Sequence, residues 1–161
     1  MWNQELSTAV GKIPSGLFII CAKQGEQIDG FLGSWIQQVS FQPLLISLCI
    51  KPGRPAYEAI MAQGVFSVNI VGDHKKDLLK PFWSGYDPEK KPFDQISYQL
   101  SERGSLLLEE AYAVIECKKR HSFQPGDHEL VIAEVLNSYT HTDLATTIKP
   151  IIHLRKNGTS Y

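Results

Sequence analysis

The sequence contains no apolar run near the ~20 residues that a membrane-spanning helix needs, so we expect no transmembrane segment. Its first residues lack the basic and apolar regions of a secretory signal, so we expect no leader. Cysteine is scarce: only Cys21, Cys49 and Cys117 occur, far apart and each within an apolar run. This usage is typical of reduced, buried thiols in a cytosolic protein and predicts a cytoplasmic location.

Sequence motifs of several enzyme classes are also missing. No CxxC or HxxxH spacing indicates a zinc site, and we expect no metal. The absence of Walker, G-x-G-x-x-G and G-x-S-x-G motifs weighs against P-loop enzymes, Rossmann dehydrogenases and hydrolases. Sixteen basic residues balance 17 acidic ones for a net charge of −1, which argues against a nucleic-acid binder with a broadly basic surface. This net charge is still compatible with a local basic pocket for one small anion.

The 161 residues fit a single domain, residues 1–161. Short segments rich in β-forming residues predict strands at 17–22, 28–40, 44–50, 65–71, 113–118, 129–138 and 151–154. Helices are predicted at 5–12, 54–63 and 73–79, and residues 82–93 are predicted to form a lid-like loop. Many strands with few helices favour a mostly β fold, an antiparallel barrel.

The most informative stretch is residues 29–40. Ser34, Gln38 and Ser40 lie at even spacing, so one long strand would place them on one face. Glycines at 30 and 33 indicate a bulge or the close approach of a ligand. The face is interpreted either as an anion-binding surface or as an ordinary solvated strand.

Two further motifs carry candidate chemistry. Lys51 and Arg54 stand at a strand end directly before a helix, where helix N–H groups and two cations favour an anion such as phosphate. His128 follows Gln124-Pro125-Gly126-Asp127 and would be able to orient a substrate or donate a proton near neutral pH. The alternatives are an exposed turn with solvated cations and a plain hairpin turn.

Taken in order, these motifs resemble the flavin reductase family, the FMN-binding split-barrel proteins, and are especially similar to the flavin reductase module of cyanobacterial diflavin flavoproteins. The resemblance runs from about Ile13 to Leu136. It rests on 13–20 (IPSGLFII), on Gly30, Ser34 and 39–47 (VSFQPLLIS), and on 66–70 (FSVNI), 116–117 (EC) and 126–128 (GDH). Gln37 and Gln38 replace the small hydroxyl residues often found there, and Leu44 replaces a second proline.

This resemblance implies a Greek-key split β-barrel with a few peripheral helices, and a homodimer with FMN near the subunit interface. It implies hydride transfer from NADH or NADPH to flavin. By the same resemblance Leu32, Gly33 and Ser34 would bind the flavin phosphate and ribityl chain, and Arg54 would reach the phosphate. Gln38, Val39 and Ser40 would line the cofactor. Cys49, Ile50 and Lys51 would edge the isoalloxazine or its tail, and His128, the catalytic candidate, would sit near the flavin ring or the nicotinamide.

The absence of a catalytic triad agrees with flavin chemistry, because a flavin itself accepts the hydride and the protein supplies binding and orientation. The resemblance leaves two alternatives to an NAD(P)H-dependent FMN reductase. One is an FMN-bound electron carrier without NAD(P)H turnover, like a flavoredoxin. The other is an interaction domain that has lost the cofactor. The expected partners are flavin, pyridine nucleotide, a second copy of the chain and an electron-acceptor protein, with no nucleic acid or membrane.

Overall fold

The computed structural model describes residues 3–140 and 147–159 of the chain. Strands dominate it, as the sequence predicted. They are β1 Ser15–Gly16, β2 Phe18–Gln24, β3 Gln27–Gly33, β4 Ile36–Ser40, β5 Leu45–Ile50, β6 Val65–Ile70, β7 Tyr98–Leu100, β8 Leu106–Leu108, β9 Ala113–Phe123, β10 Glu129–Thr140 and β11 Ile152–His153. The helices are α1 Gln4–Gly11 and α2 Pro55–Gln63, with 3-10 helices η1 Asp73–Phe82 and η2 Pro92–Asp94.

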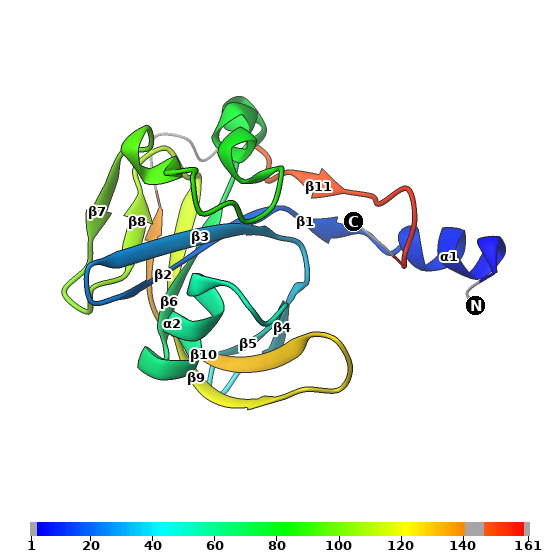
Figure 1. Cartoon of the computed structure of the whole chain (residues 1–161), viewed down its shortest axis with the longest axis horizontal. Helices are drawn as coiled ribbons and strands as arrows, with labels where there is room; N and C mark the ends of the chain where they lie inside the picture. The colour runs from blue at the N-terminus through cyan, green and yellow to red at the C-terminus, as the bar shows by residue number, and fades with distance from the viewer. Residues whose placement is uncertain (1–2, 141–146, 160–161) are drawn as a thin grey trace.

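Seven strands form one antiparallel sheet in the order β3-β2-β6-β9-β10-β5-β4. Its two edge strands, β3 and β4, are neighbours along the chain, because only Ser34 and Trp35 separate them. The strand ends Gly33 and Ile36 are three residues apart in sequence and can therefore be separated by only about 10 Å. The sheet must therefore curl until its opposite edges nearly meet, and Figure 1 shows the resulting open barrel. This arrangement confirms the predicted antiparallel split barrel, with its split at Ser34 and Trp35.

Strand β2 carries core residues on both of its faces. Ile20 and Ala22 belong to the cluster inside the barrel, which α2 covers through Ala56, Ala59 and Ile60. The alternate residues Ile19 and Cys21 belong to a second cluster with η1 and β8. A strand that is buried on both faces needs a continuous apolar sequence, which explains the run from 17 to 22.

Buried polar side chains fasten the β7–β8 hairpin to the sheet. Asn69 on β6 donates to the carbonyl oxygen of Ile19 at 3.0 Å and accepts from the backbone N–H of Leu108 at 3.0 Å. Glu116 on β9 is fully buried and accepts hydrogen bonds from Ser101 and Arg103, which lie between the two hairpin strands. The sequence analysis missed both strands of this hairpin, because three-residue strands are too short to show a period.

An arm projects from the barrel and contains both described ends of the chain (Figure 1). It is formed by α1 and by the antiparallel pair β1–β11. The predicted first helix is confirmed, and its N-cap is Asn3, whose side chain accepts from the backbone N–H of Leu6 at 2.7 Å. The backbone N–H of Gly158 donates to the Ser7 carbonyl oxygen at 2.7 Å, which ties the C-terminal segment to α1.

Two predicted elements differ from the structure. The single strand expected at 28–40 is broken at Ser34 and Trp35, because the chain crosses there from one edge of the sheet to the other. The helix expected to stop at Leu79 continues to Phe82 as a 3-10 helix that contains Pro81. Within residues 3–140 and 147–159, no helix has the length and apolarity to cross a membrane.

Candidate functional site

A cavity of about 650 Å³ opens at the split in the barrel. We call it the central cavity. It is bounded by the end of β3, the crossing at Ser34 and Trp35, the end of β5 with the turn that follows it, the loop after η1, and the start of β10. Its lining residues are Phe31, Leu32, Gly33, Ser34, Trp35, Cys49, Lys51, Pro52, Gly53, Arg54, Phe82, Trp83, Ser84, Gly85, Tyr86 and His128.

Arg54 reaches this cavity from the turn before α2 and is fixed from behind. Its Nη2 donates to the carbonyl oxygen of Gly30 at 3.3 Å, and its Nε lies 3.6 Å from Oδ2 of Asp29. The same Oδ2 accepts from the backbone N–H of Ala56 at 2.8 Å. The start of α2 is thus capped by a carboxylate of this chain, whereas the sequence analysis expected the helix end to face a bound anion.

The Arg54 guanidinium also stacks on aromatic rings, 4.6 Å from the ring centre of Phe31 and 5.9 Å from that of Tyr86. Burial lowers the pKa of Arg54, and the nearby Asp29 carboxylate opposes that shift. Its Nε has no hydrogen-bond partner within the described part of the chain. The group is therefore a cation held in place beside the cavity.

The lining of the central cavity is cationic and contains no counter-charge. Lys51 is exposed and, within the described residues, belongs to no ion pair. All the lining residues lie in the described part of the chain, and none is Asp or Glu. The half-buried Ser34 adds a hydroxyl donor at the barrel split. Such a donor set suits a phosphate group.

His128 is held against Trp35, with the two ring centres 5.0 Å apart. Its Nδ1 lies 2.9 Å from Oδ1 of Asp127, and this contact is the largest cause that holds the pKa of Asp127 below its usual range. Arg155 from the C-terminal segment lies over the Trp35 ring at 5.0 Å. Trp35 therefore organises a histidine and an arginine at the rim of the cavity.

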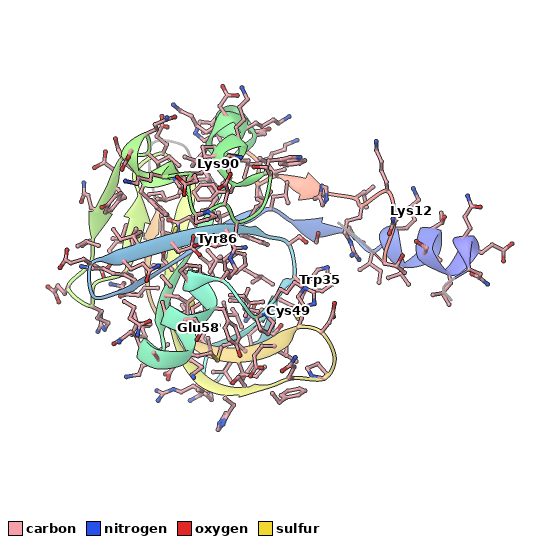
Figure 2. The ribbon with its side chains drawn as sticks, in the orientation of Figure 1. Lys12, Trp35, Cys49, Glu58, Tyr86 and Lys90 are labelled. Carbon is pink, nitrogen blue, oxygen red and sulfur yellow. The ribbon has the colours of Figure 1, made fainter. Side chains whose placement is uncertain are left out.

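The loop after η1 forms the outer wall of the cavity. Tyr86 lies in front of β3, and Trp35 and Cys49 lie near each other beside the base of the arm (Figure 2). Trp83 is 62% exposed although it lines the cavity. Lys90 donates to Ser84 Oγ at 2.7 Å, which braces the loop. Trp83 is therefore a wall residue of the cavity and not a core residue.

Comparison with known proteins agrees with this geometry. The sequence profile of the family described as "Flavin reductase like domain" matches residues 10–159. The chain belongs to this family. Diflavin flavoprotein A 1 of Synechocystis sp. is 31% identical over 161 residues, covering 99% of this chain but 27% of that protein. The chain thus spans about a quarter of the length of the curated relatives it matches.

Two solved structures show the same flavin reductase-like fold. The NADH:FAD oxidoreductase of Streptomyces globisporus C-1027 is similar with a TM-score of 0.80 and 20% identity, covering 94% of this chain and 87% of that one. An FMN-binding protein from Thermus thermophilus, solved with p-hydroxybenzaldehyde, is similar with a TM-score of 0.76 and 22% identity, covering 88% and 82%.

The flavin reductase-like chain brings most of the predicted site residues into the central cavity. These are Leu32, Gly33, Ser34, Cys49, Lys51, Arg54 and His128. Ile50 is not among them, because successive residues of a strand face opposite sides and Ile50 packs in the core with 1% exposed. Gln38, Val39 and Ser40 lie on the edge strand β4 and do not line the central cavity. A bulge between Gln38 and Ser40 also breaks the face they were expected to share with Ser34.

The sequence analysis did not single out the aromatic walls of the cavity. Phe31, Trp35, Trp83 and Tyr86 carry no local pattern that separates a cavity wall from a core position. The need for glycine at positions 30 and 33 of β3 also has a physical reason within the chain itself. A Cβ on Gly33 would lie 2.5 Å from Cδ1 of Ile20, and one on Gly30 would lie 2.8 Å from Cζ of Phe93. Protein side chains therefore occupy the space that a Cβ would need at both positions.

Proposed function

We propose that this chain binds FMN in the central cavity and reduces it with NADH or NADPH. The observation that carries the proposal is a cavity of about 650 Å³ at the barrel split, with cations, aromatic walls and no lining carboxylate. Its volume is within the range of cofactor sites, roughly 300–1,000 Å³. The family supports flavin reduction, while the names of its two structural relatives mention FAD in one case and FMN in the other.

The residues present suit a flavin mononucleotide. Lys51, Arg54 and Ser34 would hold the phosphate, since two cations and a hydroxyl match its charge and its acceptor oxygens. Leu32 and Gly33 would flank the ribityl chain, and Cys49 would edge the ring. When bound, FMN supplies the hydride-accepting chemistry, so the chain needs no nucleophile or strong acid of its own.

His128 is the proposed catalytic residue. Trp35 and Asp127 contact its ring at the cavity, and this arrangement would place the imidazole beside the bound flavin ring or the nicotinamide. A hydrogen bond from the imidazole would orient the hydride donor against the bound flavin. His128→Asn should lower kcat more than it changes FMN affinity, because the phosphate contacts remain.

The proposal also covers the domain organisation, the cellular location, the oligomeric state and the electron acceptor. Residues 1–161 would act as one domain, in the cytoplasm, where free thiols such as those of this chain persist. Exposed apolar side chains favour a homodimer: Phe41 is 89%, Ile13 62% and Val39 50% exposed. Gln38, Val39 and Ser40 would then meet the flavin through that interface. The electron acceptor would be another protein or protein region.

The deciding experiment adds FMN and then NADH or NADPH to the purified chain and follows absorbance loss of the nucleotide. Continuous oxidation in the presence of FMN is the expected result, and His128→Asn should slow it. Binding of FMN without oxidation of either nucleotide would overturn the reductase and leave the electron carrier. Failure to bind FMN would overturn both and leave the interaction domain. Light scattering should give twice the 18.1 kDa chain mass, and a monomer would refute the dimer.

A further inference from the structure

A second cavity, of about 510 Å³, lies beside the central one. We call it the C-terminal cavity. It is lined by Leu17, Leu32, Gly33, Ser34, Trp83, His153, Leu154, Arg155, Lys156 and Asn157. Leu32, Gly33, Ser34 and Trp83 line both cavities. Ligand groups held in the two spaces would therefore lie next to each other, separated only by this shared wall.

The C-terminal segment makes the second cavity basic. Arg155 and Lys156 are adjacent in the chain, His153 stands two residues earlier, and no Asp or Glu belongs to the lining, all of which lies within the described residues. Neither cation forms an ion pair with another described residue. Cations concentrated in a cavity with apolar walls raise the local concentration of anions. The cavity therefore fits an anionic ligand distinct from the group held by Lys51 and Arg54.

The segment is held in place and does not trail in solvent. Strand β11 pairs with β1, and the backbone N–H of Gly158 donates to the Ser7 carbonyl oxygen at 2.7 Å. The C-terminal segment packs so closely on α1 that a Cβ on Gly11 would lie 3.0 Å from the Arg155 carbonyl oxygen. Arg155 is also fixed over Trp35 at 5.0 Å. A site whose side chains are ordered before binding loses less entropy when a ligand arrives.

We propose that residues 153–157 bind the diphosphate of the pyridine dinucleotide that donates the hydride. This inference rests on the proposed function and adds to it a subsite with named residues. A dinucleotide carries two neighbouring phosphate charges, which match Arg155 and Lys156. Its nicotinamide must also reach the flavin, which the shared wall at Leu32, Gly33 and Ser34 allows. Trp83, exposed between the cavities, offers an aromatic face to a ring.

The test uses the full chain and two probes. ADP-ribose, which has the diphosphate but no nicotinamide, is titrated calorimetrically with and without FMN, and NADH and NADPH kinetics are measured at saturating FMN. Lys156→Gln is the first variant, because Lys156 is exposed and its loss should not disturb the fold. Arg155→Gln is the second, with Arg155→Lys to restore the charge. Lys118→Gln is the matched control, an exposed cation that lines neither cavity.

Wild-type protein should bind ADP-ribose, and each Gln variant should weaken that binding and raise the donor KM by about tenfold. For Lys156→Gln the dissociation constant of FMN and kcat should stay within twofold. Arg155→Lys should recover most of the ADP-ribose affinity that Arg155→Gln loses. Lys118→Gln should behave as wild type. High salt should reduce the difference between variants and wild type, because the interaction is between charges.

Several results would overturn the subsite. Unchanged ADP-ribose affinity in both Gln variants would remove residues 153–157 from donor binding, while leaving the reductase activity intact. A weakened FMN affinity with an unchanged donor KM would show that this cavity holds the flavin phosphate instead. Absence of ADP-ribose binding to wild type would also refute it. Failure of the proposed function looks different, because FMN itself would not bind or no nucleotide would be oxidised.

Discussion

Asp29 joins the start of α2 to Arg54, a lining residue of the central cavity, and removal of its side chain should lower the free energy of unfolding. Its Oδ2 caps α2 through the backbone N–H of Ala56 at 2.8 Å and lies 3.6 Å from Nε of Arg54. Both charged side chains are mostly buried, with 11% of Asp29 and 17% of Arg54 exposed. Asp29→Ala removes both contacts. Asp29→Asn keeps an oxygen for Ala56 and removes only the charge.

The size of the effect follows from the two contacts. Loss of a helix N-cap lowers the free energy of unfolding by about 1 kcal/mol. Loss of one partner costs about 0–1 kcal/mol for an exposed ion pair and about 3–5 kcal/mol for a buried one. Nε and Oδ2 are 3.6 Å apart and not hydrogen-bonded. The loss of this ion pair should therefore cost less than that of a well-formed buried pair, about 1–2 kcal/mol. We expect losses of about 2–3 kcal/mol for Asp29→Ala and about 1–2 kcal/mol for Asp29→Asn.

The assay is equilibrium unfolding in urea, followed by tryptophan fluorescence. With a slope of about 2 kcal/mol per molar urea, the midpoint should fall by about 1–1.5 M for Asp29→Ala and by about 0.5–1 M for Asp29→Asn. Asp77→Ala is the matched control, since Asp77 is 84% exposed and pairs with the exposed Lys80 on the same 3-10 helix. Equal midpoints for Asp29→Ala and Asp77→Ala would refute the role given to Asp29.

Two further predictions concern the thiols and the β7–β8 hairpin. Burial raises the pKa of Cys49, so its alkylation by iodoacetamide at neutral pH should be slower than that of a free thiol and should speed up as the pH rises. Bound FMN should block the reaction, because Cys49 lines the central cavity. Fast alkylation that FMN does not change would contradict this position. Asn69→Ala should lower the free energy of unfolding by about 2–3 kcal/mol, because it leaves the Ile19 carbonyl and Leu108 N–H buried without their partner; thermal unfolding unchanged from wild type would contradict this.

Much of the fold could be predicted because its determinants are local. The apolar run at 17–22 had to be a strand buried on both faces, and Pro55 with Gly64 bracketed α2 closely. The break at Ser34 and Trp35 could not be predicted in this way. It depends on the opposite edges of a seven-stranded sheet meeting in space, which no window of the sequence contains.

The site was predicted best where its residues belong to one short segment. Lys51 and Arg54 stand together in the chain, and both reach the central cavity. The role of Asp29 could not be predicted, because strands β4 and β5 separate it in sequence from its partners Arg54 and Ala56. Arg155 and Lys156 were not predicted as site residues for the same reason. The sequence does not show that the C-terminal segment lines one cavity with Ser34.

The measurement that tests the central claim most directly is a titration of the purified chain with FMN, following quenching of flavin fluorescence. We predict saturable quenching with a dissociation constant in the low micromolar range or tighter. Lys51→Gln should weaken it about tenfold, while Lys118→Gln should leave it unchanged. Quenching that does not saturate, or that is equally strong in Lys51→Gln, would contradict a flavin phosphate site at the barrel split.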